Sequence, residues 1–245
     1  AGRSFEHHIN YIFKKAALLN RECVINISAG SYAGSHDGLD IAARIIDSLI
    51  RAKSGRAVVA AAGNAGRQNF HLGYELLADT NFSWFEYSPS LFSVGGIYFK
   101  LYADTADFNK IQFSFSVDKS SPKYSRRAST PFSSIHSRLY QPLQDTLTNS
   151  TGKILAVVQS YAEVNDGVYS MEVAIVDPDS SQYLYGFNVG GTGRFDLWSS
   201  LELTGTSNIL SDNLPSAVDF PLMLNYKKAD SLQSMVSSFT CLESV

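Results

Sequence analysis

The stretch GRAVVAAAGNAG, residues 55–66, determines how the first part of the chain is interpreted. Residues 57–61 within it are small and apolar, which is typical of a strand buried on both faces of a parallel sheet. A similar apolar run covers residues 23–27, and residues 39–49 between the two runs have the apolar spacing of a helix. Strand, helix and strand in this order predict a parallel sheet with a right-handed crossover.

A second amphipathic helix is predicted before the first of these strands, over residues 4–19. Ser4 is its predicted N-cap. Its apolar side chains recur at intervals of three and four residues, so they share one helical face. They are Phe5, Ile9, Ile12, Phe13, Ala16 and Ala17.

From residue 68 the pattern changes to short, alternating, aromatic-rich segments separated by turn residues. YSMEVAIVD at 169–177 and SQYLYGFNV at 181–189 are examples. Many short strands between turns predict an antiparallel sandwich or jelly roll. The last residues return to mixed character, which predicts that the β region is inserted at an exposed loop.

The predicted fold class is therefore an α/β parallel-sheet segment plus an inserted antiparallel β-sandwich or jelly-roll domain. The α/β segment is placed at residues 1–67 and the inserted domain at residues 68–222. Residues 223–245 are predicted to return to the α/β core.

Composition excludes several classes of function. The chain has 245 residues, 18% of them charged, and a net charge of -3 without a long run of one sign. A basic face for nucleic acid and a polybasic membrane anchor are therefore not expected. No apolar stretch approaches the roughly 20 residues that a membrane-spanning helix needs.

Both predicted parallel strands end in loops of very small residues, where open parallel sheets bind their ligands. Small side chains there let a substrate backbone approach closely. Asn64 adds an amide donor, which suits stabilisation of a developing oxyanion. The alternative is an ordinary Gly-Asn turn, because both residues tolerate left-handed backbone angles. The small residues are Ser28, Ala29 and Gly30 after the first strand and Ala61, Ala62 and Gly63 after the second.

The segments CVINISAGSYAGSHDGLDIAARIID, residues 23–47, and GRAVVAAAGNAG together resemble the middle of subtilisin-like serine peptidases, the subtilase family. The resemblance covers roughly residues 4–66. It implies that Asn64 is the oxyanion donor. It also implies that residues 28–30 and 61–63 form opposite walls of the S1 pocket, with peptides or proteins as substrates. The β region is similar in architecture to the jelly-roll insertion of some bacterial subtilases, including the clostridial Csp-type germination proteases.

The family's three catalytic motifs, D-T/S-G, H-G-T and G-T-S-M-A, are absent. The resemblance therefore implies an internal fragment of a serine endopeptidase that lacks the Asp, His and Ser of the triad. The fragment alone is expected to be inactive, and a secreted or cell-envelope location is implied by the family only. The alternative is a degenerate scaffold whose jelly-roll domain binds a protein or glycan partner.

No cofactor is expected. Asp177 and Asp179 leave calcium open, since carboxylate oxygens are its usual ligands, although a Pro-containing turn explains them equally well. The family's sheet would place one strand between those of Cys23 and Cys241. Two strand spacings, about 9.6 Å, exceed the reach of a disulfide, so two free thiols are predicted.

Overall fold

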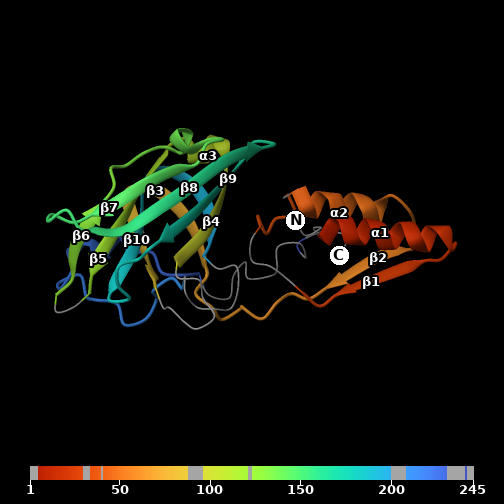
Figure 1. The fold of residues 1–245 in the computed structure, drawn as a ribbon, viewed down its shortest axis with the longest axis horizontal. Coiled ribbons are helices and arrows are strands. Elements are labelled where there is room, and N and C mark those ends of the chain that lie inside the picture. Colours follow the sequence, from red (N-terminus) through yellow and green to blue (C-terminus); the bar gives the residue numbers. More distant parts are fainter. Residues whose placement is uncertain are drawn as a thin grey trace. The chain divides into compact units, whose positions relative to one another are not determined.

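The structure is a computed structural model that describes residues 5–29, 34–39, 41–87, 96–120, 123–199, 208–230 and 241. Figure 1 gives the order of the elements along the chain. The chain divides into two compact units, Ala1–Gly66 with Ser234–Val245 and Arg67–Gln233. Each unit is described in turn.

The first unit contains the four elements that the sequence predicts in it. They are α1 (Phe5–Leu18), β1 (Cys23–Ile27), α2 (Ile41–Arg51) and β2 (Arg56–Ala60). The two strands are parallel and pair from Cys23↔Arg56 to Ile27↔Ala60. Ile25, Ile27 and Val58 lie on one face of this sheet and form a core with the buried faces of the helices. The helical residues of that core are Ile9, Phe13, Ala43, Ile46 and Ile50.

The other face of the two-stranded sheet is open. Val24 is 71% exposed and Val59 is 54% exposed, and Asn26, the register partner of Val59, is exposed as well. A strand whose side chains are apolar on both faces normally has both faces covered. This unit therefore buries only one side of its sheet.

The second unit is built on a sheet of eight strands. All neighbouring strands in it are antiparallel, and their order is β6-β5-β10-β4-β9-β8-β7, with β3 paired to β10. Its elements are β3 (His71–Glu86), β4 (Gly96–Asp104), α3 (Thr105–Phe108), β5 (Ile111–Lys119), β6 (Ser125–Ser129), η1 (Ile135–Arg138), β7 (Leu143–Thr148), β8 (Ile154–Asn165), β9 (Val168–Val176), β10 (Tyr183–Trp198) and η2 (Pro221–Asn225).

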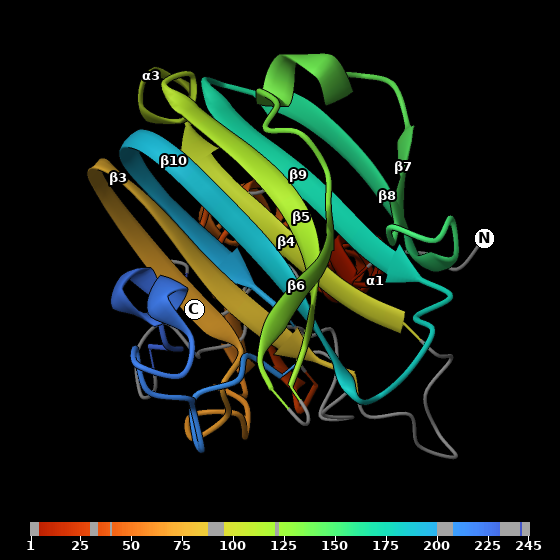
Figure 2. The ribbon, with the colours of Figure 1, turned by 90° about the vertical axis from the view of Figure 1, so that its left-hand side faces the viewer.

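Strand β10 makes the sheet curve back on itself. One of its edges pairs with β3 over almost the whole strand, while the other pairs first with β5 and then, over the last three residues, with β4. The change occurs at Gly191 and Gly193, which have φ values of +115° and +143°. A β-bulge lies at the same place, between Gly190 and Thr192. Bulges and glycines of this kind bend a strand, and Figure 2 shows the resulting curvature.

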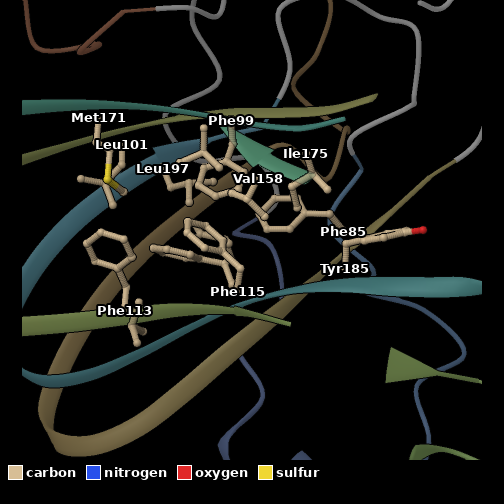
Figure 3. Close-up of a cluster of buried hydrophobic side chains, with 14 of the residues drawn as sticks. Phe85, Phe99, Leu101, Phe113, Phe115, Val158, Met171, Ile175, Tyr185 and Leu197 are labelled. Carbon is tan, nitrogen blue, oxygen red and sulfur yellow. The ribbon is translucent and has the colours of Figure 1, made fainter. Parts of the chain in front are cut away.

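The interior of the curved sheet is a single hydrophobic core that is rich in aromatic rings (Figure 3). The rings of Phe85 and Phe99 are stacked with centroids 4.8 Å apart, and Phe187 lies 5.2 Å from Phe99. Such ring pairs contribute about 0.5–1.5 kcal/mol each beyond their buried area. The core draws on strands from both ends of the order, including β5 and β8, so the sheet is nearly closed.

Two features of the predicted fold class are wrong. The described chain is mostly β, and parallel pairing between its strands is limited to β1 and β2, so it is not a subtilisin-like α/β parallel-sheet fold. The β region is one nearly closed sheet rather than a two-sheet sandwich, because β10 is hydrogen-bonded to both β5 and β4. Cys23 and Cys241 are not joined in a disulfide, in agreement with the prediction.

Candidate functional site

The small residues singled out in the sequence lie together at the carboxyl edge of the β1–β2 sheet. Ile27 and Ala60 are the last paired residues, and the amide of Ala61 donates to the carbonyl of Ile27 at 3.0 Å. The parallel register therefore brings residues 28–29 beside residues 61–63. Ser28 and Ala29, with Ala61, Ala62 and Gly63, are all exposed.

Asn64 follows at the end of this edge and is exposed. Gly63 before it has φ +100°, a backbone conformation that favours glycine and turns the chain out of the strand direction. The Nδ2 of Asn26 in β1 donates to the hydroxyl of Ser28, two residues further along the chain, at 3.2 Å. Gly30 lies outside the described residues. The geometry offers exposed backbone and an amide side chain at one sheet edge.

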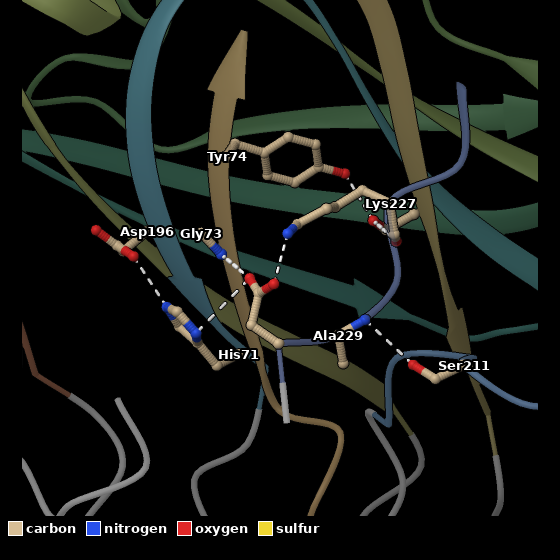
Figure 4. Close-up of polar contacts among 9 residues, drawn as sticks. His71, Gly73, Tyr74, Asp196, Ser211, Lys227 and Ala229 are labelled. Carbon is tan, nitrogen blue, oxygen red and sulfur yellow. Dashed lines mark hydrogen bonds and ion pairs between the residues drawn. The ribbon is translucent and has the colours of Figure 1, made fainter. Parts of the chain in front are cut away.

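A second cluster, which the sequence did not reveal, surrounds His71 at the start of β3 (Figure 4). His71 Nε2 lies 2.9 Å from Asp196 Oδ1, near the end of β10. Because a carboxylate only accepts, Nε2 carries the hydrogen. His71 Nδ1 lies 3.9 Å from Asp230 Oδ2, which is too long for a hydrogen bond. The imidazole is buried and packs on Trp198 at 4.8 Å.

Asp230 holds the chain after η2 against β3. Its Oδ2 accepts from the amide of Gly73 at 2.6 Å, its Oδ1 pairs with Lys227, and its own amide donates to the carbonyl of His71 at 2.9 Å. The segment 226–230 is thereby fixed along the start of β3. Carboxylates that accept charge-assisted bonds of this kind are among the stronger polar contacts in proteins.

Tyr74 and Ser83 extend the network beneath Lys227. The Ser83 hydroxyl donates to the carbonyl of Lys227 at 2.6 Å, so its one hydrogen is used. The Tyr74 hydroxyl, 2.6 Å away, therefore donates to Ser83. Burial raises the pKa of Tyr74 well above its usual range, and this keeps the hydroxyl protonated as a donor.

This cluster lacks a reacting group. Within the described part of the chain, no serine or cysteine hydrogen-bonds to His71, whose Nε2 is occupied by Asp196 and whose ring is covered by Trp198. Its geometry fixes strand ends and a returning segment rather than activating a nucleophile. The sequence held no signal for it, because its members lie 125 and 159 residues apart and meet only through the sheet register.

Metal binding has little support among the described residues. No group of three or more His, Cys, Asp or Glu side chains there is arranged to hold a metal ion. Asp179 pairs with Lys153, and its amide donates to the carbonyl of Leu155 at 2.9 Å. Asp177 has φ +50° in the turn between β9 and β10. The calcium alternative at Asp177 and Asp179 stays a prediction.

Comparison with known proteins gives a fold and no family. No family model matches the chain, and no curated protein matches it. Among solved structures, the chain is similar to the CspB protease of Clostridium perfringens, with a TM-score of 0.62 and 16% sequence identity. The match covers 95% of this chain but 48% of that protease, so the chain spans about half the length of its neighbour.

The predicted membership of the subtilase family is wrong, because no family model matches and the chain is mostly a nearly closed antiparallel sheet rather than a subtilase α/β fold. A likeness at 16% identity shows the fold alone, and that fold is dominated by the curved antiparallel sheet. The comparisons support a coarser statement: the chain has a fold that is also found in part of a protease.

Among the described residues, none of the helices has the length and apolarity to cross a membrane.

Proposed function

We propose that this chain is a segment of a serine endopeptidase that binds peptide or protein substrates along the carboxyl edge of β1 and β2. The observation that carries the proposal is the parallel register of the two strands, which end together in exposed small residues. The fold likeness to a protease supports it. The nucleophile and its base would come from other parts of the peptidase.

The chemistry of this edge is that of substrate positioning. An extended peptide needs backbone partners and no obstructing side chains, and residues 28–29 and 61–63 offer both in the described structure. Gly30, outside the described residues, belongs to the same proposed wall. The Asn64 amide would donate to the oxyanion of the tetrahedral intermediate, a role that needs a fixed neutral donor.

The open face of the β1–β2 sheet supports the view that this unit is part of a larger one. Helices α1 and α2 cover one face of its two strands and leave the other without a partner among the described residues. Exposed apolar side chains such as Val24 and Val59 are typical of surfaces that are covered in the complete assembly. We infer that further protein covers this face in the peptidase. A secreted or cell-envelope location is part of the proposal.

The test is the substitution Asn64→Ala in the complete protein that contains this chain, with hydrolysis of a peptide amide as the readout. Loss of one oxyanion donor is expected to lower kcat about 10²–10³-fold and to leave KM nearly unchanged. Asn10→Ala, which removes a partly exposed amide side chain on α1 outside the proposed substrate edge, is the control and is expected to keep kcat. Equal kcat values for the wild type and Asn64→Ala would exclude the proposed role of Asn64.

The alternative function is that of a binding module on an inactive scaffold. It predicts no peptide hydrolysis by the complete protein and no effect of Asn64→Ala. One observation in the second unit favours binding as an additional property, and it is independent of the proposed peptidase edge.

A further inference from the structure

A groove of about 580 Å³ lies on the outer face of the curved sheet, over β4, β9, β8 and β7. Its floor is a row of residues that the strand registers place side by side. Tyr98 pairs with Ala174, Ala174 with Gln159, and Gln159 with Gln144. The side chain of Ala174 is short, so the surface of the row is recessed there, between the longer side chains of Tyr98 and Gln159.

The neighbouring row supplies a second aromatic ring and a carboxylate. Lys100 pairs with Glu172, and Glu172 pairs with Tyr161. Tyr161 therefore stands two strands away from Tyr98, about 9.6 Å across the sheet. Both tyrosines line the groove and are partly exposed, while Glu172 and Gln159 are exposed.

Internal contacts fix the polar side of the groove. Lys100 Nζ pairs with Glu172 Oε1 at 2.9 Å, and the Tyr98 side chain hydrogen-bonds to Glu172. Burial first, and then the charge of Glu172, raise the pKa of Tyr98 to about 12, so its hydroxyl stays protonated at neutral pH. A site held in place in this way loses little entropy when a ligand binds.

We propose that this groove binds a neutral oligosaccharide. Its volume is within the range of small-ligand sites. The tyrosine rings would cover the apolar C–H faces of sugar rings. Amide and carboxylate side chains would bond the hydroxyl groups, which act as both donors and acceptors. The short side chain of Ala174 leaves room for a sugar ring to lie on the sheet.

The same features argue against other ligands. Strands β8 and β9 are hydrogen-bonded on both edges, so a peptide finds no free backbone groups there for strand addition. Among the described residues that line the groove, the charged side chain is Glu172, and the neighbouring cation Lys100 is already paired with it, so the groove offers a phosphate-bearing ligand no net positive charge. A neutral polyhydroxyl ligand fits this balance of groups.

The test is isothermal titration calorimetry of the full chain with soluble oligomers of glucose, linked β-1,4 and α-1,4, and of N-acetylglucosamine. At least one oligomer is expected to bind with a Kd between micromolar and millimolar. Tyr161→Ala and Tyr98→Ala are expected to weaken that binding about tenfold. Tyr161→Phe keeps the ring and is expected to stay within a few-fold of the wild type.

Two controls keep the result interpretable. Tyr11→Ala removes an exposed tyrosine on α1, outside the groove, and is expected to leave the affinity unchanged. Gln159→Ala changes an exposed side chain, so it tests the groove if the tyrosine variants fail to fold by circular dichroism. No binding to any oligomer overturns the proposal. Binding that survives Tyr161→Ala, Tyr98→Ala and Gln159→Ala overturns it as well.

Discussion

His71 and Asp196, 125 residues apart in the chain, are joined by a hydrogen bond of 2.9 Å between Nε2 and Oδ1. The bond links the first residue of β3 to the last part of β10, where Gly73 pairs with Asp196 and His71 with Trp198. On the other side of the imidazole, Asp230 fixes the segment that follows η2. Three distant parts of the second unit thus meet at one buried ring.

Asp230→Ala is expected to destabilise the second unit by about 2 kcal/mol. The variant removes the acceptor of the Gly73 amide and the partner of Lys227, and it leaves a part-buried donor without its bond. Urea unfolding followed by tryptophan fluorescence measures the change. Asp79→Ala, an exposed position on β3, is the control and is expected to change stability by less than about 0.5 kcal/mol. Equal losses in the two variants would contradict the role given to Asp230.

Gly191→Ala is expected to cost more than about 2 kcal/mol, because two effects add there. The residue has φ +115°, and a Cβ would lie 2.1 Å from the carbonyl oxygen of Lys110. The backbone would have to move where β10 changes its partner from β5 to β4.

Gly152→Ala separates the two effects on Gly191. Gly152 also has a positive φ, +84°, but a Cβ there meets nothing within 4 Å. It is expected to lose only about 1 kcal/mol, the cost of the left-handed backbone. If Gly191→Ala unfolds at no lower urea concentration than Gly152→Ala, the close approach to Lys110 does not contribute to the loss of stability.

Arg126→Met is expected to destabilise the sheet by about 2 kcal/mol, since it leaves a buried carboxylate with one partner fewer. Asp118 is 0% exposed, and it accepts from Arg126 Nε at 2.7 Å and from Trp84 Nε1 at 2.8 Å. The value is below that of a fully buried pair because Arg126 is about a third exposed. Thermal unfolding monitored by circular dichroism measures it.

Two further variants check the assignment to Asp118. Arg127→Met, on the same strand with an exposed side chain, is expected to be nearly neutral. Adding Asp118→Asn to Arg126→Met removes the buried charge and is expected to recover part of the lost stability. If the double variant loses more stability than the two single variants lose together, the buried charge of Asp118 is not the cause.

Local sequence patterns predicted the elements of the first unit because each is defined by a period within one segment. Strand β1 has the predicted limits, residues 23–27, and β2 covers residues 56–60 in place of the predicted 57–61. In the second unit, alternation predicted antiparallel strands but not how they are joined. The choice between a sandwich and one nearly closed sheet depends on β10 pairing with both β5 and β4, which local periodicity does not encode.

Local sequence likewise predicted only those candidate sites that depend on neighbouring residues in the chain. The small residues before Asn64 could be named from the sequence, since they follow directly from where two strands end, while their role stays a prediction. The His71 cluster and the row from Tyr98 to Gln144 could not, because each exists only through strand register. Residues 129–149 show no regular apolar period, yet they contain η1 and β7, whose Leu147 is the one buried position of its strand.

Glu86→Gln is expected to change how stability depends on pH. Burial, and then the nearby charge of Asp212, raise the pKa of Glu86 in the folded state. The folded chain therefore holds this proton more tightly than the unfolded chain, and stability falls as pH rises from the ordinary pKa of glutamate to the raised one. The Gln variant has no such loss, so its stability relative to the wild type increases through that window and is constant above it.

Because Glu86 is only half-buried, the gain of Glu86→Gln at neutral pH is expected to stay below about 1 kcal/mol. Urea unfolding of both proteins between about pH 4 and pH 8 measures it. Asp212→Asn removes the neighbouring charge and is expected to give a smaller gain in the same direction. Parallel stability curves for the wild type and Glu86→Gln across this range would mean that the folded chain does not favour protonated Glu86.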